Sequence, residues 1–102
     1  MPKYNVRFLP EAVSDLEKIA DYNLIMVGKA SSERIVSKIL DAIEILSDYP
    51  NAGPVHPDEL LGPLGYRKLV LTDIYVAVYR VISDEVFIYR IVNGKTDYPK
   101  LI

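Results

Sequence analysis

Residues 65–92 read GYRKLVL-TD-IYVAVYRVI-SDE-VFIYRIV, and this stretch decides the fold. Three apolar runs rich in Val, Ile and Tyr are separated by short polar breaks, which is the pattern of three consecutive antiparallel strands. The middle run, 74–82, is apolar on both alternating faces, as expected of a strand that is internal in its sheet and covered twice. Arg67, Arg80 and Arg90 interrupt these runs, and a guanidinium on an apolar strand costs desolvation energy unless it is paired or hydrated. The arginines are therefore the first indication of function.

Composition narrows the class of protein. The chain has 102 residues, which fits one domain over 1–102, and half of them are hydrophobic, which is enough for a core. With no cysteine and a single histidine, His56, the sequence excludes disulfides, thiolate metal sites and histidine clusters, and we expect no metal and no cofactor. The net charge of −2 argues against a dedicated nucleic-acid binder, which is usually basic. We find no signal peptide and no apolar run near the roughly 18 residues of a membrane helix, and so expect a cytoplasmic protein.

The N-terminal half predicts a short strand followed by two helices. Residues 3–8 alternate polar and apolar side chains, which indicates a half-buried strand. A first helix is predicted from Pro10 to about residue 27, with Glu11 and Asp15 complementing the helix dipole and Gly28 ending it. A second helix should be capped by Ser31 or Ser32 and reach residue 48. The short link makes the two helices an antiparallel hairpin.

Two features lie outside this regular pattern. The first helix ends in LIMV, residues 24–27, which is more apolar than one face requires. We expect this end to be buried under a loop, the alternative being a contact patch for a partner. Residues 51–64, rich in proline and glycine, form a long loop that can cross the sheet. His56 lies in this loop, where we expect a solvated side chain rather than a general base.

The predicted fold class is α+β, in the order β-α-α-β-β-β. An antiparallel four-stranded sheet carries the αα hairpin on one face. Two helices can cover only one face, so we expect the other face to be open and to carry part of the arginines and tyrosines of the strands.

No sequence motif specifies a reaction, and no P-loop, GxSxG, HExxH or EF-hand pattern is present. The candidate target- or RNA-binding residues are basic and polar side chains of the strands and of the C-terminal segment: Arg67, Lys68, Arg80, Arg90, Lys95, Asp97 and Tyr98. With neighbouring tyrosines they could bind phosphate and stack on bases, or form a protein interface. Alternatively, they pair with rim carboxylates, namely Asp73, Asp84, Glu85 and Asp97. We expect Arg67, Arg90 and Lys95 to be partly exposed and not all neutralised inside the chain.

The order of these parts resembles the RelE/ParE superfamily of bacterial type II toxins, known also as plasmid stabilisation or addiction-module proteins. The segments that carry the resemblance are VRFLPEAVSDLEKIADY (6–22), AIEILSDYPNAG (42–53), GYRKLVL (65–71), YVAVYRV (75–81) and VFIYRIVNGKTDYPKLI (86–102), and together they span essentially the whole chain. The resemblance implies that the first strand lies beside the last. It also implies a cognate antitoxin, which wraps the toxin with an extended or helical segment, in a hetero-oligomer or beside a toxin homodimer.

Two activities occur among such proteins, and the sequence favours one. RelE-like toxins cut mRNA on the ribosome with several basic side chains, whereas ParE-like toxins inhibit DNA gyrase and are not known as nucleases. Where RelE-like toxins place an arginine in the third strand and another after the Gly-Lys turn, this chain has Val76 and Thr96, and its terminal Asp97 pattern looks more like ParE. We therefore predict a growth-inhibiting toxin that acts on DNA gyrase. Whether it is an enzyme depends on this choice, since a ParE-like toxin is not one and a RelE-like toxin is an mRNA endonuclease. The alternatives are a ribosome-dependent mRNA endonuclease and a diverged, non-toxic interaction module.

Overall fold

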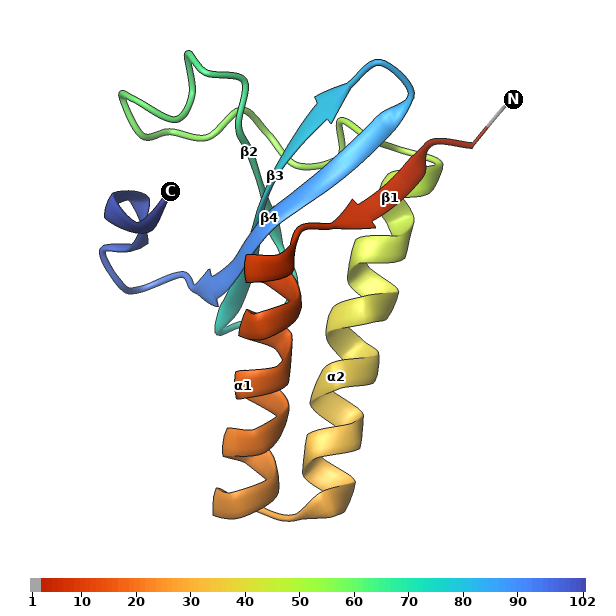
Figure 1. Ribbon diagram of the computed structural model, residues 1–102, viewed down its shortest axis with the longest axis vertical. Coiled ribbons are helices and arrows are strands. Elements are labelled where there is room, and N and C mark those ends of the chain that lie inside the picture. The colour runs from red at the N-terminus through yellow and green to blue at the C-terminus, as the bar shows by residue number, and fades with distance from the viewer. Residues whose placement is uncertain (1–2) are drawn as a thin grey trace.

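The computed structural model describes residues 3–102, in which an αα hairpin stands below one face of a four-stranded sheet (Figure 1). The elements, in chain order, are β1 (Asn5–Phe8), α1 (Pro10–Met26), α2 (Lys29–Glu44), the 3₁₀ turn η1 (Ile45–Ser47), β2 (Arg67–Val70), β3 (Tyr75–Ile82), β4 (Glu85–Asn93) and the 3₁₀ turn η2 (Tyr98–Leu101). The predicted α+β order is confirmed.

The sheet has the order β1-β4-β3-β2, so the first strand does lie beside the last. β2, β3 and β4 form an antiparallel meander, but β1 pairs with β4 in parallel, Asn5 opposite Glu85 and Phe8 opposite Ile88. The expectation of a fully antiparallel sheet was wrong for this one pair. The two antiparallel helices return the chain to the end of the sheet where β1 began, so β2 runs in the direction of β1, β3 runs against it and β4 again runs with it (Figure 1).

The second helix of the hairpin, α2, begins earlier in the chain than predicted. α2 starts at Lys29, directly after Gly28, whose φ of 137° suits glycine and lets the chain reverse between the helices. The predicted cap residues lie inside the helix, where the Ser32 hydroxyl donates to the Ala20 carbonyl at 2.7 Å and ties the two helices together. At the other end the α-helix stops at Glu44 and continues as η1 rather than reaching residue 48.

The end of α1 is exposed, so the expectation that it is buried under a loop was wrong. Leu24, Ile25, Met26 and Val27 are 50%, 79%, 64% and 69% exposed, and they lie at the far end of the hairpin from the sheet. We call these four residues with Tyr22, which is also exposed, the hairpin-end patch.

Two apolar clusters flank the sheet, because β3 is internal and buried on both sides as predicted. The larger one lies between the sheet and the helices, where Ile39 and Ile43 of α2 pack with Tyr79 and Ile88. The smaller one lies on the opposite face and consists of Val76, Val78, Val92 and Tyr98, with Tyr66 and Ile102 packed against it. We had expected this second face to be open. It is instead partly covered by the C-terminal turn η2.

Val78→Asp tests this two-sided core. Val78 is 0% exposed, so an aspartate there buries an unpaired carboxylate at a cost of several kcal/mol, against a total stability of about 5–15 kcal/mol. We expect the variant to be unfolded or close to it in chemical denaturation followed by circular dichroism. Val70→Asp is the control, since Val70 is 66% exposed on the edge strand β2 and should change the free energy of unfolding by less than about 0.5 kcal/mol. A folded Val78→Asp variant of ordinary stability would contradict the assignment.

Candidate functional site

Three side chains gather on the sheet face opposite the helices. The Arg80 guanidinium of β3 lies over the ring of Tyr66, 5.3 Å from its centroid, and its Nη1 donates to the Tyr89 hydroxyl at 3.4 Å. The rings of Tyr66 and Tyr89 meet edge to face with centroids 4.9 Å apart. Within residues 3–102 no carboxylate is at ion-pair distance from Arg80. This Tyr66–Arg80–Tyr89 cluster is therefore a half-buried aromatic platform with one cation that no acid neutralises.

A β-bulge contributes to this arrangement. Val78 pairs with Arg90 but the next residue, Tyr79, pairs with Ile88, so Tyr89 is an extra residue on β4. A bulge bends its strand and redirects the side chains at the extra residue. The Tyr89 ring can thus contact the ring of Tyr66, the residue directly before β2.

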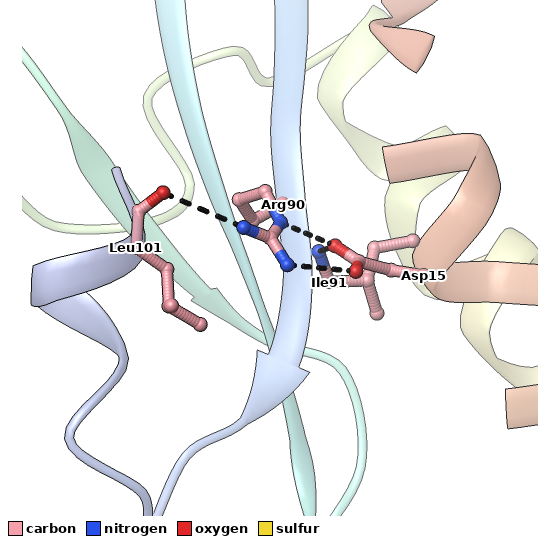
Figure 2. Close-up of polar contacts among 4 residues, drawn as sticks. All are labelled: Asp15, Arg90, Ile91 and Leu101. Atoms are coloured by element: carbon pink, nitrogen blue, oxygen red, sulfur yellow. Dashed lines mark hydrogen bonds and ion pairs between the residues drawn. The ribbon is translucent and has the colours of Figure 1, made fainter. Parts of the chain in front are cut away.

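Arg90 is held inside the protein (Figure 2). Its Nε and Nη2 donate to the two oxygens of Asp15, at 2.7 and 2.9 Å, and Nη1 points to the Leu101 carbonyl at 3.5 Å. One Asp15 oxygen also accepts from the Ile91 backbone N–H at 3.0 Å, and the carboxylate raises the pKa of Arg90 further above its ordinary value. Arg90 therefore joins α1 to β4, and we do not include it in the target surface.

Arg67 and Tyr79 hold the loop that leaves η1. The Arg67 Nη1 donates to the Gly53 carbonyl at 2.8 Å, while the buried Tyr79 hydroxyl donates to the Pro50 carbonyl at 2.8 Å and accepts from the Gly53 N–H at 2.9 Å. Burial raises the pKa of Tyr79, so its proton stays in place. Position 53 requires glycine, because a Cβ there would lie 2.6 Å from the Lys68 carbonyl oxygen.

The remaining candidates are spread around the same face. Lys68 of β2 is half-buried and lies opposite Val78, and Lys95 is exposed. Asp97 is also exposed and pairs with Lys100 at 2.9 Å, and such a surface ion pair contributes little to the free energy of folding. Arg67, Arg90 and Lys95 thus all keep some exposure, and only Arg90 is neutralised by a carboxylate of the described chain. The expectation that they are not all neutralised is confirmed, although the carboxylate involved is Asp15 rather than a rim acid.

His56 is buried rather than solvated, which corrects our expectation. It is 5% exposed, and its Nε2 lies 2.8 Å from the hydroxyl of Tyr98, itself 4% exposed. Its Nδ1 accepts from the Asp58 backbone N–H at 3.1 Å. Burial is the main cause that lowers the pKa of His56, with the charge of Lys68 acting in the same direction and Asp58 opposing it. Burial likewise raises the pKa of Tyr98.

The sequence signals for these contacts differ in strength. Asp15 lies at helical spacing between Ala12 and Ile19, the two residues of α1 that are most buried, so a carboxylate on the buried stripe indicated a buried partner. We had assigned it to the helix dipole. The pairing of His56 with Tyr98, 42 positions apart, had no local signal at all.

Across residues 3–102 the structure has no group of three or more His, Cys, Asp or Glu side chains that could hold a metal ion. Nor does any helix in this described part have the length and hydropathy needed to cross a membrane.

Solved structures with the same architecture are bacterial toxins and their complexes. A chain of the chromosomal ParDE toxin–antitoxin system from P. aeruginosa aligns with a TM-score of 0.76 and 26% identity, covering 89% of this chain and 96% of that one. The toxin–antitoxin complex RelBE2 from Mycobacterium tuberculosis aligns with a TM-score of 0.65 and 24% identity, over 89% and 98% of the two chains. The YoeB dimer from Staphylococcus aureus gives 0.62 and 17%, over 92% and 99%. The last two, at their low identity, show the shared fold alone.

Residues 6–98 match the family described as the ParE toxin of the type II toxin–antitoxin system parDE. The chain belongs to this ParE toxin family and is a toxin of the type II toxin–antitoxin class, with the RelE/ParE fold. No curated protein matches it significantly.

Asp15→Asn tests whether the Arg90 contact is structural. The substitution keeps the size of the side chain but leaves a guanidinium that is 22% exposed without its carboxylate, so we expect a loss of about 2–4 kcal/mol in the free energy of unfolding. Urea denaturation measures it, with Asp21→Asn on the exposed side of the same helix as the control. Equal stability of the two variants would show that the pair contributes nothing.

Proposed function

We propose that this toxin inhibits bacterial growth by binding DNA gyrase, and that the Tyr66–Arg80–Tyr89 cluster is the centre of the surface it uses. The observation that carries the proposal is this cluster, because an arginine stacked on one tyrosine and hydrogen-bonded to a second is the kind of anchor that dominates protein interfaces. Membership of the ParE toxin family supports the choice of target, because the resemblance of the sequence to the RelE/ParE superfamily implies gyrase inhibition for ParE-like toxins.

The surroundings of the cluster suit a protein target better than RNA. Val76, where RelE-like nucleases carry an arginine, is buried in the smaller apolar cluster, and the Thr96 hydroxyl donates to the Asn93 carbonyl at 2.8 Å. Each missing cation near a phosphorane transition state costs roughly 10²–10³ in rate. Two such losses and a net charge of −2 leave little support for cleavage on a dense phosphate surface.

One observation favours the nuclease alternative. His56 and Tyr98 are hydrogen-bonded, with Lys68 near enough to affect the histidine, and together they could supply the base and acid that RNA cleavage needs. Against this, both rings are buried and both imidazole nitrogens are engaged by the chain. The third alternative, a non-toxic interaction module, predicts a folded protein whose expression leaves growth unchanged.

Induced expression with matched arginine variants tests the target surface. Arg80→Ala removes the central cation, and we expect roughly 10–100-fold weaker inhibition in a gyrase supercoiling assay. Arg7→Ala is the control, because Arg7 is an exposed arginine on the edge strand β1 and is paired with Glu85. Primer extension on cellular mRNA runs in parallel. Codon-specific cuts in the ribosomal A site with unaffected gyrase would establish the nuclease instead, and equal effects of the two variants would remove Arg80 from the surface.

We further propose that the cognate antitoxin covers the hairpin-end patch with an acidic amphipathic segment. A hollow of about 380 Å³ adjoins the patch and is lined by Asn23, Val27, Ser31, Arg34, Ile35 and Lys38. Arg34 and Lys38 have no carboxylate at ion-pair distance in the described part of the chain, so the site combines apolar surface with two free cations. Carboxylates on the rim of an apolar helix or strand would complement both.

Ile25→Glu with Arg34→Glu tests the antitoxin surface. We expect the double variant to bind the product of the adjacent reading frame at least tenfold more weakly in calorimetry, because it replaces the apolar contact and reverses the complementary charge. Leu60→Glu, at an exposed leucine of the long loop, is the control. Unchanged affinity would contradict the assignment. A toxin dimer that this double variant makes monomeric in light scattering would instead show that the patch joins two copies of the chain.

A further inference from the structure

Among the described residues, the C-terminal turn η2 makes one buried polar contact with the rest of the protein, besides the exposed hydrogen bond from Arg90 Nη1 to the Leu101 carbonyl. Tyr98, its first residue, packs with Val76, Val78 and Val92, and its hydroxyl meets His56 Nε2 at 2.8 Å. The two rings are arranged edge to face, with centroids 5.6 Å apart and an interplanar angle of 78°. The contact joins the loop before β2 to the end of the chain.

The orientation of the His56 ring is set from both sides. The Asp58 N–H donates to Nδ1 at 3.1 Å, so Nδ1 is the acceptor, Nε2 carries the hydrogen, and Nε2–H donates to the Tyr98 oxygen. Asp58 is fixed in turn, because its carboxylate accepts from the Leu60 and Leu61 N–H groups at 2.9 and 3.0 Å. The His56 backbone N–H donates to the Tyr66 carbonyl at 2.9 Å. The neutral ring with hydrogen on Nε2 is thus the form that fits.

We propose that neutral His56 positions the C-terminal turn for target binding, and that protonation of His56 releases the turn. A proton on Nδ1 would face the Asp58 N–H, so two donors would meet where one hydrogen bond now exists. The new charge would be buried, with Lys68 of β2 opposing it, the Asp58 carboxylate on the same loop favouring it, and the neutral Tyr98 hydroxyl of η2 as its other neighbour. The His56 ring must move to separate the two donors and to hydrate its charge, and Tyr98 then loses its hydrogen bond with Nε2.

The turn is placed to affect the target surface. A hollow of about 310 Å³ is lined by Leu9, Glu11, Tyr66, Tyr89, Arg90, Leu101 and Ile102. Tyr66 and Tyr89 of the cluster thus share a wall with the last two residues of the chain, so movement of η2 would reshape the surface beside Arg80. This functional part of the inference rests on the proposed function.

The sign of the pH effect follows from the lowered pKa of His56. The unfolded chain binds a proton near pH 6.5, while the folded chain resists it to a lower pH, so the stabilisation is complete above about 6.5 and is lost as the pH falls below that value. We expect the turn to be held at pH 7.5 and progressively released on acidification.

Nuclear magnetic resonance tests the positioning directly, because His56 is the single histidine of the chain and its ¹⁵N signals need no assignment. We expect the Nε2–H tautomer at pH 7.5, an imidazole titration below 6.5, and amide shifts of Tyr98 and Leu101 that follow the same curve. An ordinary titration, or amide signals of the turn that stay unchanged through it, would overturn the proposal whatever the target.

Matched variants add the functional readout. His56→Gln keeps an N–H donor toward Tyr98 but cannot titrate, whereas His56→Phe keeps the ring and loses both bonds. In the supercoiling assay we expect His56→Gln to inhibit equally at pH 7.5 and 6.0. The unsubstituted toxin should weaken relative to it at pH 6.0, by at most about fourfold, because a pKa below 6.5 leaves at least about a quarter of the folded chains with neutral His56. His56→Phe should be weak at both pH values. Tyr98→Phe should resemble His56→Phe, with Tyr49→Phe at an exposed tyrosine as the control.

The outcomes separate the two proposals. If the turn follows the His56 titration but no variant inhibits gyrase at any pH, the positioning stands and the gyrase proposal fails. If gyrase is inhibited but folded His56→Phe is as active as the unsubstituted protein and keeps the pH profile, the positioning role is wrong.

Discussion

The rest of the structure depends on the Asp15 carboxylate, which binds the Arg90 guanidinium and the Ile91 N–H together. β1 ends at Phe8, opposite Ile88, and the edge of β4 beyond that point meets α1 instead of a strand. The bulge at Tyr89 falls at the same place. A carboxylate from the helix therefore completes the hydrogen bonding of β4, and it neutralises an arginine that would be costly to bury alone. By joining α1, β4 and the C-terminal turn, this contact sets the position of the helices relative to the sheet.

Two cores of different character follow from that placement. The helix-side core is a conventional apolar layer, whereas the opposite core is small and depends on Tyr98 and Ile102 from the end of the chain. A sheet face that is packed against a terminal turn can be exposed more easily than one packed against strands, because fewer contacts must break for the turn to move away. The Tyr66–Arg80–Tyr89 cluster lies on that second face, so its shape and the hold on the turn are linked.

The hairpin-end patch and the Tyr66–Arg80–Tyr89 cluster are separate surfaces and can bind different partners. The hairpin-end patch lies at the end of the helices that points away from the sheet (Figure 1), whereas the Tyr66–Arg80–Tyr89 cluster lies on the sheet. One surface can therefore bind a neutralising partner while the other belongs to the target, and neutralisation then requires the partner either to reach across the sheet or to exclude the target by bulk. Large apolar side chains left in water at a helix end are costly to keep without a partner, which is why we assign them an occupant.

Much of this molecule was readable from local pattern. Alternation and helical spacing predicted the strand and helix order, the hairpin and the internal position of β3, because these depend on neighbours a few residues apart. The resemblance to the RelE/ParE superfamily came instead from five sequence segments and their order along the chain. The parallel pairing of β1 was also implicit in the chain path but was missed. What only the tertiary structure decided are contacts between distant residues: Asp15 with Arg90, His56 with Tyr98, and Arg80 with Tyr66 and Tyr89. Any of these polar side chains could equally have faced water, and the choice depends on which charges and rings the folded chain brings within a few ångströms. Sequence thus determined the elements and the family, and packing decided which cations are structural and which remain free to bind.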